Sequence, residues 1–182
     1  GQEVTGDLRV VIPPAFGAGL AADIVEAFHA RCPRVSLTMG MMLSGEIHEG
    51  LLTSRIDLGV LYPPLRSRAL ATKTLWTEQL YVIGAPGVLT DEPMRASEAL
   101  SRPLVLPSPA HGLRRMIEAF AAKQGATLDV RVEVNSLRVM VELLKRGQGV
   151  AFLPPRALTD ALEQGHLVAA PLEGEGIARP TM

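Results

Sequence analysis

The sequence predicts an α/β fold in which most strands run parallel. Short apolar runs of strand length alternate along the chain with segments whose apolar residues recur every three or four positions. The composition, 47% hydrophobic and 20% charged over 182 residues, is that of a globular protein with a sizeable core. No apolar run is long enough to cross a bilayer. Alternating strands and helices of this kind favour a largely parallel sheet.

Each predicted strand is an apolar run that proline, glycine or a polar turn brings to an end. The run "LRVVI" at residues 8–12, for example, stops at Pro13 and Pro14. The predicted strands, in order, are residues 8–12, 34–39, 56–61, 78–84, 104–106, 130–134, 149–155 and 167–170.

The helices lie between these strands. In the first of them, Leu20, Ile24 and Phe28 form one apolar stripe, and Pro33 ends the helix. The predicted helical segments, in order, are residues 20–28, 47–51, 97–103, 113–121 and 136–147, with a further short helix that ends at Gly165.

Two parts of the chain resemble each other in organisation. Residues 34–61 and 130–153 both read as a strand, a polar turn, an amphipathic helix and a buried strand with a glycine. The likeness is too loose for a sequence repeat, but it suggests two similar lobes. In open α/β sheets, ligands bind at the carboxyl ends of the strands, where the polar turns lie. We therefore expect a ligand cleft between the lobes.

Several functional classes are excluded. The 18 Lys and Arg against 19 Asp and Glu leave a net charge of −1, which disfavours nucleic-acid binding by this segment. A single cysteine excludes internal disulfides. The segment "GAGLAA" fits G-x-G-x-x-A, but "PPAF" separates it from the strand, where a dinucleotide fingerprint has its tight turn. Histidines are scattered singly, and no G-x-S-x-G or P-loop occurs. We expect no catalytic residues, no cofactor and no metal.

The order and spacing of several motifs match a known family. The first part fits G-x-L-R-[IV], a segment ending in P-x-V-x-L, and a later S-x-x-I…L…I-D-L-G-V, and "GQGVAFLP" fits a glycine signature of the second part. Across nearly its whole length the chain resembles the effector-binding domain of LysR-type transcriptional regulators, and most closely the branch that regulates nitrogen assimilation. The matching positions of the first part are Gly6, Leu8, Arg9, Pro33, Val35, Leu37, Ser44, Ile47, Leu51, Ile56, Asp57, Leu58, Gly59 and Val60.

The resemblance implies a type II periplasmic-binding-protein-like fold of two Rossmann-like lobes with a ligand cleft between them. Lobe I would comprise residues 1–79 and 171–182, and lobe II residues 80–170. The implied function is to bind a small polar or anionic effector and so modulate DNA binding by a winged helix-turn-helix that is not in this chain. The implied setting is the cytoplasm, without membrane contact, in a dimer that forms part of a tetramer.

The resemblance also implies a set of effector-binding residues in the strand-to-helix turns. We expect Ser44 to be the N-cap of its helix and to face an anion there. Asn135 and Ser136 occupy the corresponding turn of the second lobe. Phe16 is also a candidate core residue, and Phe152 is expected in the core. The full predicted set is Pro13, Pro14, Ala15, Phe16, Ser44, Tyr62, Ser108, His111, Asn135 and Ser136.

The chain departs from the family pattern at the mouth of the first lobe. Met42 stands where the family usually has glycine, which predicts a smaller or more apolar mouth. In the family, the first helix of lobe I packs on a lobe II helix of a partner, here Leu20–Phe28 on Leu113–Phe120. The alternative function is that of a periplasmic solute-binding protein of a transporter, which shares the fold.

Overall fold

The computed structural model describes residues 4–63 and 69–182 and consists of two compact units. Unit 1 comprises Gly1–Trp76 and Pro180–Met182, and unit 2 comprises Thr77–Arg179. The chain therefore passes from one unit to the other twice, after Trp76 and after Arg179. The lobe boundaries and the cleft expected from the sequence stay predictions.

Unit 1 is built on a parallel sheet in the order β2-β1-β3. Strand β1 (Gly6–Ile12) pairs with β2 (Val35–Met41) along its whole length and with β3 (Leu58–Gly59) at two positions. A 3₁₀ turn, η1 (Pro14–Phe16), leads from β1 into α1 (Gly17–Arg31), and α2 (Ser44–Leu52) connects β2 to β3. The parallel pairing requires these crossover helices.

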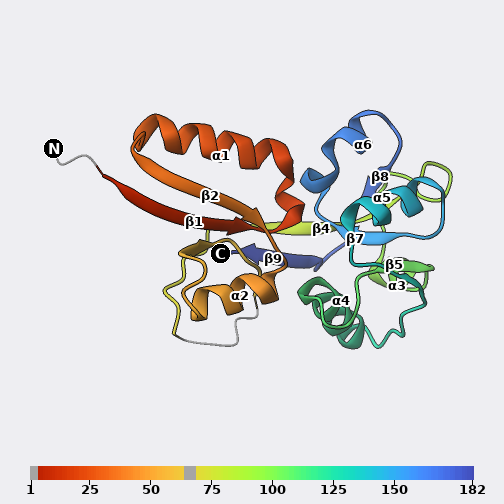
Figure 1. Ribbon diagram of the computed structural model, residues 1–182. Coiled ribbons are helices and arrows are strands. Elements are labelled where there is room, and N and C mark those ends of the chain that lie inside the picture. Colours follow the sequence, from red (N-terminus) through yellow and green to blue (C-terminus); the bar gives the residue numbers. More distant parts are fainter. Residues whose placement is uncertain (1–3, 64–68) are drawn as a thin grey trace. The chain divides into compact units, whose positions relative to one another are not determined.

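The two helices of unit 1 cover opposite faces of its sheet (Figure 1). Val10 and Ile12 pack in one cluster with Phe16 and with Ala21 of α1, whereas Val11 packs with Ile47 of α2 in another. This alternation follows from the two-residue period of a strand. On the α2 side, a Cβ added at Gly59 would lie 2.4 Å from a side-chain carbon of Ile47. Close packing of α2 therefore requires glycine in β3.

An ion pair joins β1 to the segment that precedes β3. The Nε and backbone N–H of Arg9 donate to Oδ2 of Asp57 at 2.9 Å each, and Nη2 donates to Oδ1 at 2.7 Å. Both residues belong to the family pattern described above. These hydrogen bonds from Arg9 lower the pKa of Asp57 to about 2, from an ordinary value of 3.8. The pair fixes the register at which β3 joins the sheet.

Unit 2 contains two sets of strands. Strand β4 (Trp76–Gly84), whose first residue belongs to unit 1, lies between β7 (Ala151–Leu153) and β8 (Val168–Ala170) and is antiparallel to both. Strand β9 (Ile177–Thr181) also pairs with β4, and β5 (Leu104–Leu106) pairs in parallel with β6 (Val130–Glu133). Val150, just before β7, hydrogen-bonds to both Pro103 and Val105, which brings β5 beside β7.

The helices of unit 2 enclose a single large core. Residues of β4, β5 and β7 pack there with apolar side chains of α4, α5 and the loops. Phe152 has no exposed surface, which confirms its prediction as a core residue. The helices are α3 (Ala96–Leu100), α4 (Gly112–Lys123), α5 (Leu137–Lys145), the 3₁₀ turn η2 (Pro155–Leu158) and α6 (Thr159–Glu163).

Glycine is required where α5 leads into β7. Gly149 has a φ of +147°, and a Cβ there would lie 2.6 Å from the carbonyl oxygen of Pro103. Gly147, with a φ of +67°, turns the chain at the end of α5. The glycine signature found in the sequence is therefore a packing requirement of the β5–β7 contact.

The structure differs from the sequence prediction in the direction of some strands. Strand β4 runs antiparallel to its neighbours, because it is the segment by which the chain enters unit 2 and no crossover helix sets its direction. Strand β9 was not predicted, since "GIARPT" has a proline and no clear alternation. The predicted strand 56–61 is regular only at Leu58–Gly59.

The Arg9–Asp57 pair predicts a pH-dependent contribution to stability. Because the folded-state pKa of Asp57 is depressed to about 2, its contribution is complete above the ordinary value of 3.8 and is lost as the pH falls toward 2. We expect wild type to be more stable than Asp57→Asn at pH 6, with the difference shrinking between about pH 4 and pH 2. Urea denaturation of both proteins across this range measures it. Asp91→Asn, in an exposed turn of unit 2, is the control. A difference that is constant with pH would contradict the assignment.

Candidate functional site

The predicted residues of unit 1 gather where its three parallel strands end. Ser44 begins α2, and its Oγ accepts a hydrogen bond of 3.1 Å from the backbone N–H of Tyr62, just beyond β3. Next to it, the N–H of Met42 donates to the carbonyl of Ile12 at the end of β1. The prediction that Ser44 is the N-cap is wrong, since Leu43 occupies that position. Ser44 instead joins the ends of β2 and β3.

A carboxylate of the chain itself caps α2. Oε2 of Glu46, at the third position of the helix, accepts from the backbone N–H of Leu43 at 3.0 Å. The leucine side chain cannot accept a bond in return, so only the glutamate half of a capping box is present. A negative charge therefore already lies at the helix terminus where the sequence predicted an external anion.

The segment that follows β1 divides between core and surface. Phe16 is buried, with its ring centroid 5.7 Å from that of Trp76, so it is a core residue of unit 1. Pro13 is buried as well, Ala15 is half-buried and Pro14 is exposed. Beside them, the exposed side chains of Met41 and Met42 make the end of β2 apolar. Of the predicted rim, Pro14 and Ala15 remain accessible.

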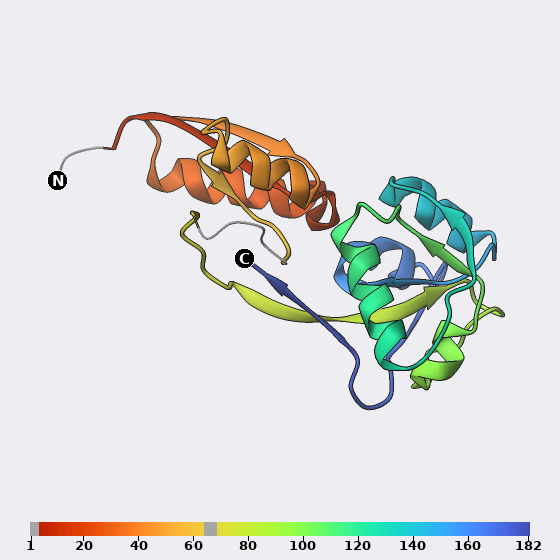
Figure 2. The same cartoon turned by 90° about the horizontal axis from the view of Figure 1, so that it is seen from below.

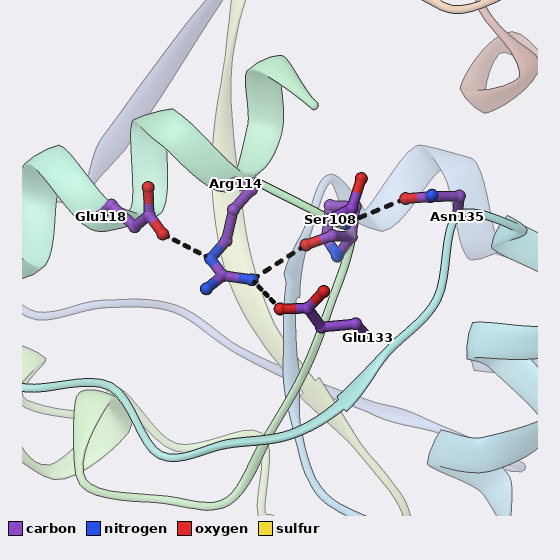
Figure 3. A network of polar contacts seen from close by, with 6 residues as sticks. Ser108, Arg114, Glu118, Glu133 and Asn135 are labelled. Atoms are coloured by element: carbon purple, nitrogen blue, oxygen red, sulfur yellow. Dashed lines mark hydrogen bonds and ion pairs between the residues drawn. The ribbon is translucent and has the colours of Figure 1, made fainter. Parts of the chain in front are cut away.

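Unit 2 has a corresponding contact at the ends of β5 and β6. The backbone N–H of Ser108 donates to Oδ1 of Asn135 at 2.9 Å (Figure 3). Ser108 follows β5 by two residues and is half-buried, whereas Asn135 follows β6 and is exposed. A side-chain oxygen from one strand end thus binds the backbone of the next strand end, as Ser44 does in unit 1.

His111 caps the helix that follows this turn. Its Nδ1 accepts from the backbone N–H of Leu113 at 3.1 Å, and the backbone N–H of His111 donates to the carbonyl of Ser108. The pKa of His111 is lowered by burial and by the nearby charges of Arg179 and Arg115. The imidazole is therefore neutral at pH 7, and with Nδ1 as the acceptor its proton lies on Nε2. His111 can donate a hydrogen bond to a ligand.

Ser136, predicted only to lie in this turn, is the N-cap of α5. Its Oγ accepts from the backbone N–H of Val139 at 3.4 Å, a long hydrogen bond. The first-turn N–H groups of Leu137 and Arg138 have no acceptor within the helix. They lie two and three residues after Asn135, at a terminus that favours a negative or polar group.

Two polar side chains of unit 2 were missed from the sequence, Arg114 and Glu78. Arg114, on α4, is buried and bonded to groups at the ends of both β5 and β6 (Figure 3). Glu78, on β4, accepts from Arg179 of β9 and from Arg156. For Arg114 the signal was present, because it lies three and seven residues before Ile117 and Ala121 of the apolar stripe. An arginine on such a stripe has to be paired.

A groove elsewhere on unit 2 contains none of the predicted effector-binding residues. It is lined by residues of α4, of β4 and of the loop that precedes β9, and has a volume of about 840 Å³. Figure 2 shows the ribbon of these three segments. Met116, Ala119 and Phe120 line it on the side of α4. Within residues 4–63 and 69–182 there is no group of three or more His, Cys, Asp or Glu placed to hold a metal ion. The same residues contain no helix long and apolar enough to cross a membrane.

The sequence model of the LysR substrate binding domain matches residues 1–182. The chain belongs to this family. Among curated proteins, the Phosphonates import ATP-binding protein PhnC of Anaeromyxobacter dehalogenans (strain 2CP-C) is 29% identical over 96% of this chain and 36% of its own length. The HTH-type transcriptional regulator YfiE of Escherichia coli (strain K12) is 23% identical over 91% of this chain and 57% of its own. This chain thus spans about a third to somewhat over half of these relatives.

Solved structures agree with the family. The CcmR regulatory domain of Synechocystis PCC6803, determined in complex with 2-PG, has a TM-score of 0.86 and 14% identity over 97% of this chain and 86% of that one. The fold is therefore the type II periplasmic-binding-protein-like fold predicted from the sequence. This LysR domain senses an effector, and the comparisons favour that function over the periplasmic solute-binding protein kept as the alternative. They do not confirm the nitrogen-assimilation branch.

The revised role of Ser44 gives a prediction about unit 1. We expect Ser44→Ala to lower the free energy of unfolding by about 1 kcal/mol and to speed exchange of the Tyr62 amide, because that N–H loses its acceptor. Glu46→Ala should cost about 0.5–1 kcal/mol through the helix terminus and leave Tyr62 unchanged. Denaturation and amide hydrogen exchange measure both. Faster Tyr62 exchange in Glu46→Ala but not in Ser44→Ala would contradict the assignment.

Proposed function

We propose that this domain binds a small polar or anionic effector through the turns at the strand ends of both units. The observation that carries the proposal is the pair of equivalent turns. In each unit, a side-chain oxygen next to a helix start binds the backbone of the neighbouring strand end. Each turn lies at the carboxyl ends of parallel strands, the edge at which α/β sheets bind ligands. We propose that units 1 and 2 are the two lobes of the family fold.

The two turns differ in charge, which supports a specific distribution of the effector's groups. Glu46 places a carboxylate at the α2 terminus of unit 1, beside the apolar Met41 and Met42. In unit 2, His111 is neutral and the positive charge of Arg115, whose Nη1 donates to the carbonyl of Ala110, acts on it. We propose that the anionic group of the effector binds at the turns of unit 2 and that its less polar part faces unit 1.

The whole protein is proposed to be a transcriptional regulator. The relative YfiE is an HTH-type regulator of which this chain spans 57%. A net charge of −1 gives the domain itself no electrostatic basis for binding DNA. DNA binding is therefore assigned to a helix-turn-helix segment outside this chain, and the place of action to the bacterial cytoplasm. The effector changes DNA binding only as far as it binds two states of the regulator with different affinity.

We also propose that a second copy of the chain docks on α4. The apolar stripe of α1 is poorly covered, since Leu20 is exposed and Ile24 and Phe28 are only half-buried. The half-buried Met116 and the exposed Ala119 of α4 line the groove of unit 2, and the resemblance pairs these two helices across a dimer. A two-fold dimer forms this contact twice.

Effector binding is tested by thermal denaturation. A ligand at about 100 times its Kd adds roughly 2.7 kcal/mol to the free energy of unfolding, which raises Tm by about 5–10 °C in a domain of this size. We expect a member of a panel of small carboxylates and phosphates, with 2-PG included, to give such a shift. Asn135→Ala should reduce the shift more than Ser44→Ala does, because the anionic group is assigned to unit 2.

The control for this experiment is Ser97→Ala, a serine in the short helix α3, away from both turns. An identical shift in wild type and in all three variants would show that the effector binds elsewhere.

The dimer proposal predicts the effect of a charge on α1. Burying a leucine contributes about 1.5–3 kcal/mol, so Leu20→Glu should raise the dimer Kd at least about tenfold. Ala22→Glu adds the same charge to the same helix about half a turn away, and should leave the Kd near the wild-type value. Sedimentation equilibrium measures both. A monomeric wild type, or equal effects of the two substitutions, would contradict the proposed contact.

A further inference from the structure

We propose that Arg114 is a positioning residue for the effector site of unit 2. Its guanidinium holds the ends of β5 and β6 at the separation at which Oδ1 of Asn135 reaches the backbone N–H of Ser108. The inference rests on the proposed function, because that function is what makes Ser108 and Asn135 part of a site. Nothing in the sequence pattern or in the comparisons assigns a role to Arg114.

The contacts of Arg114 converge on the two strand ends. Its Nη1 donates to the carbonyl oxygen of Pro107 at 3.1 Å and to Oε1 of Glu133 at 3.3 Å (Figure 3). Pro107 directly follows β5 and precedes Ser108, whereas Glu133 is the last residue of β6. One nitrogen atom therefore bridges the two strand ends. It binds the residue directly before Ser108 and the residue two positions before Asn135.

A third contact fixes the side chain to its own helix. Nε of Arg114 donates to Oε1 of Glu118 at 2.8 Å, one turn further along α4. Because the guanidinium is planar, a bond at Nε restricts the direction in which Nη1 can donate. The helix thus sets the orientation of Arg114, and Arg114 in turn sets the positions of Pro107 and Glu133.

Arg114 does not bind the effector itself. The residue is only 8% exposed, and its charge is matched by the carboxylates of Glu118 and Glu133. Two negative charges beside one positive charge leave no excess that would attract an anion. The side chain therefore acts through Ser108 and Asn135.

A gain in the free energy of unfolding does not by itself account for a buried arginine at position 114. Taking a guanidinium out of water is costly, and well-packed apolar replacements of buried ion pairs are often neutral or stabilising. A pair within one helix, such as Arg114–Glu118, contributes only a few tenths of a kcal/mol. The contacts that an apolar residue could not replace are the directional hydrogen bonds to the two strand ends.

Unit 2 contains a matched arginine that does not touch the site. Arg102 donates to Oε1 of Glu98, also four residues away, at 2.9 Å and to the carbonyl of Val88 at 2.8 Å. Like Arg114, it bonds to a carboxylate four residues away and to a carbonyl distant in sequence, but it has no second carboxylate comparable to Glu133, and neither of these two bonds reaches β5 or β6. A role in stability is common to both arginines, and a role in positioning is predicted for Arg114 alone.

The Ser108 amide provides a direct readout, because its hydrogen bond to Asn135 is the feature that Arg114 is inferred to maintain. Exchange of this amide is measured by NMR without ligand and is expressed relative to the amide of Val105 in β5, which donates to the carbonyl of Val150. In Arg114→Met we expect the ratio to rise at least about tenfold, as for loss of a hydrogen bond to a charged group. In Arg102→Met we expect no change in the ratio.

Two single-carboxylate variants keep the test decisive if Arg114→Met folds poorly. Glu133→Ala removes the β6 end of the bridge and Glu118→Ala removes only the contact within α4, and both side chains are about half exposed. We expect Glu133→Ala to raise the Ser108 to Val105 exchange ratio several-fold and Glu118→Ala to raise it less. Equal ratios in these two variants, or equal ratios in the two arginine variants, would overturn the inference.

A binding experiment with 2-PG as the probe separates this inference from the proposed function. If wild type binds 2-PG, Arg114→Met should bind it at least about tenfold more weakly and Arg102→Met should match wild type. Failure of wild type to bind 2-PG or any other member of the anion panel would count against the proposed function. The exchange ratios would still decide whether Arg114 positions Ser108 and Asn135.

Discussion

The ends of parallel strands leave backbone N–H groups without a ladder partner, and the candidate site depends on how this chain satisfies them. In unit 1 the hydroxyl of Ser44 accepts from Tyr62, and in unit 2 the amide oxygen of Asn135 accepts from Ser108. An unpaired backbone group away from water is costly. These acceptors therefore fix the path of the backbone after the strand end in each unit. They also place a polar side chain at the start of a helix, next to N–H groups that a ligand can use.

The turns of the two units share this hydrogen-bonding arrangement but differ in charge. In unit 1 the carboxylate of Glu46 satisfies the terminus of α2, and the exposed Met41 and Met42 lie just before it in the chain. Unit 2 caps its helices with the neutral groups of His111 and Ser136, while cationic side chains lie near His111. The difference in charge follows from single residues within a shared architecture. This is how one fold family can serve many effectors.

Much of the fold could be predicted from the sequence, because apolar periodicity reports which residues are buried. The strands 104–106 and 130–134 and the stripe of α4 were recognisable in this way. The antiparallel direction of β4 was not, because burial pattern carries no information on direction. The N-cap of α2 was wrongly assigned to Ser44, since the neighbouring Leu43 has no capping side chain and a distant N–H, that of Tyr62, competes for the hydroxyl.

For the candidate site, the sequence indicated the turns but not their internal contacts. Ser108 and Asn135 are 27 residues apart, and their pairing depends on the β5–β6 register, which no local pattern encodes. Arg114 could have been singled out as a charge on an apolar stripe. Its partners at Pro107 and Glu133 follow only from the three-dimensional arrangement.

The proposed effector site is tested most directly by a map of backbone amide chemical shifts during titration with the first anion found to raise the melting temperature. We expect the largest changes at the amides of residues 108–113 and 135–138 in unit 2, with smaller changes at residues 43–46 and 62 in unit 1. Changes concentrated instead on the groove residues of α4 and the loop before β9, with both turns unaffected, would contradict the proposed site.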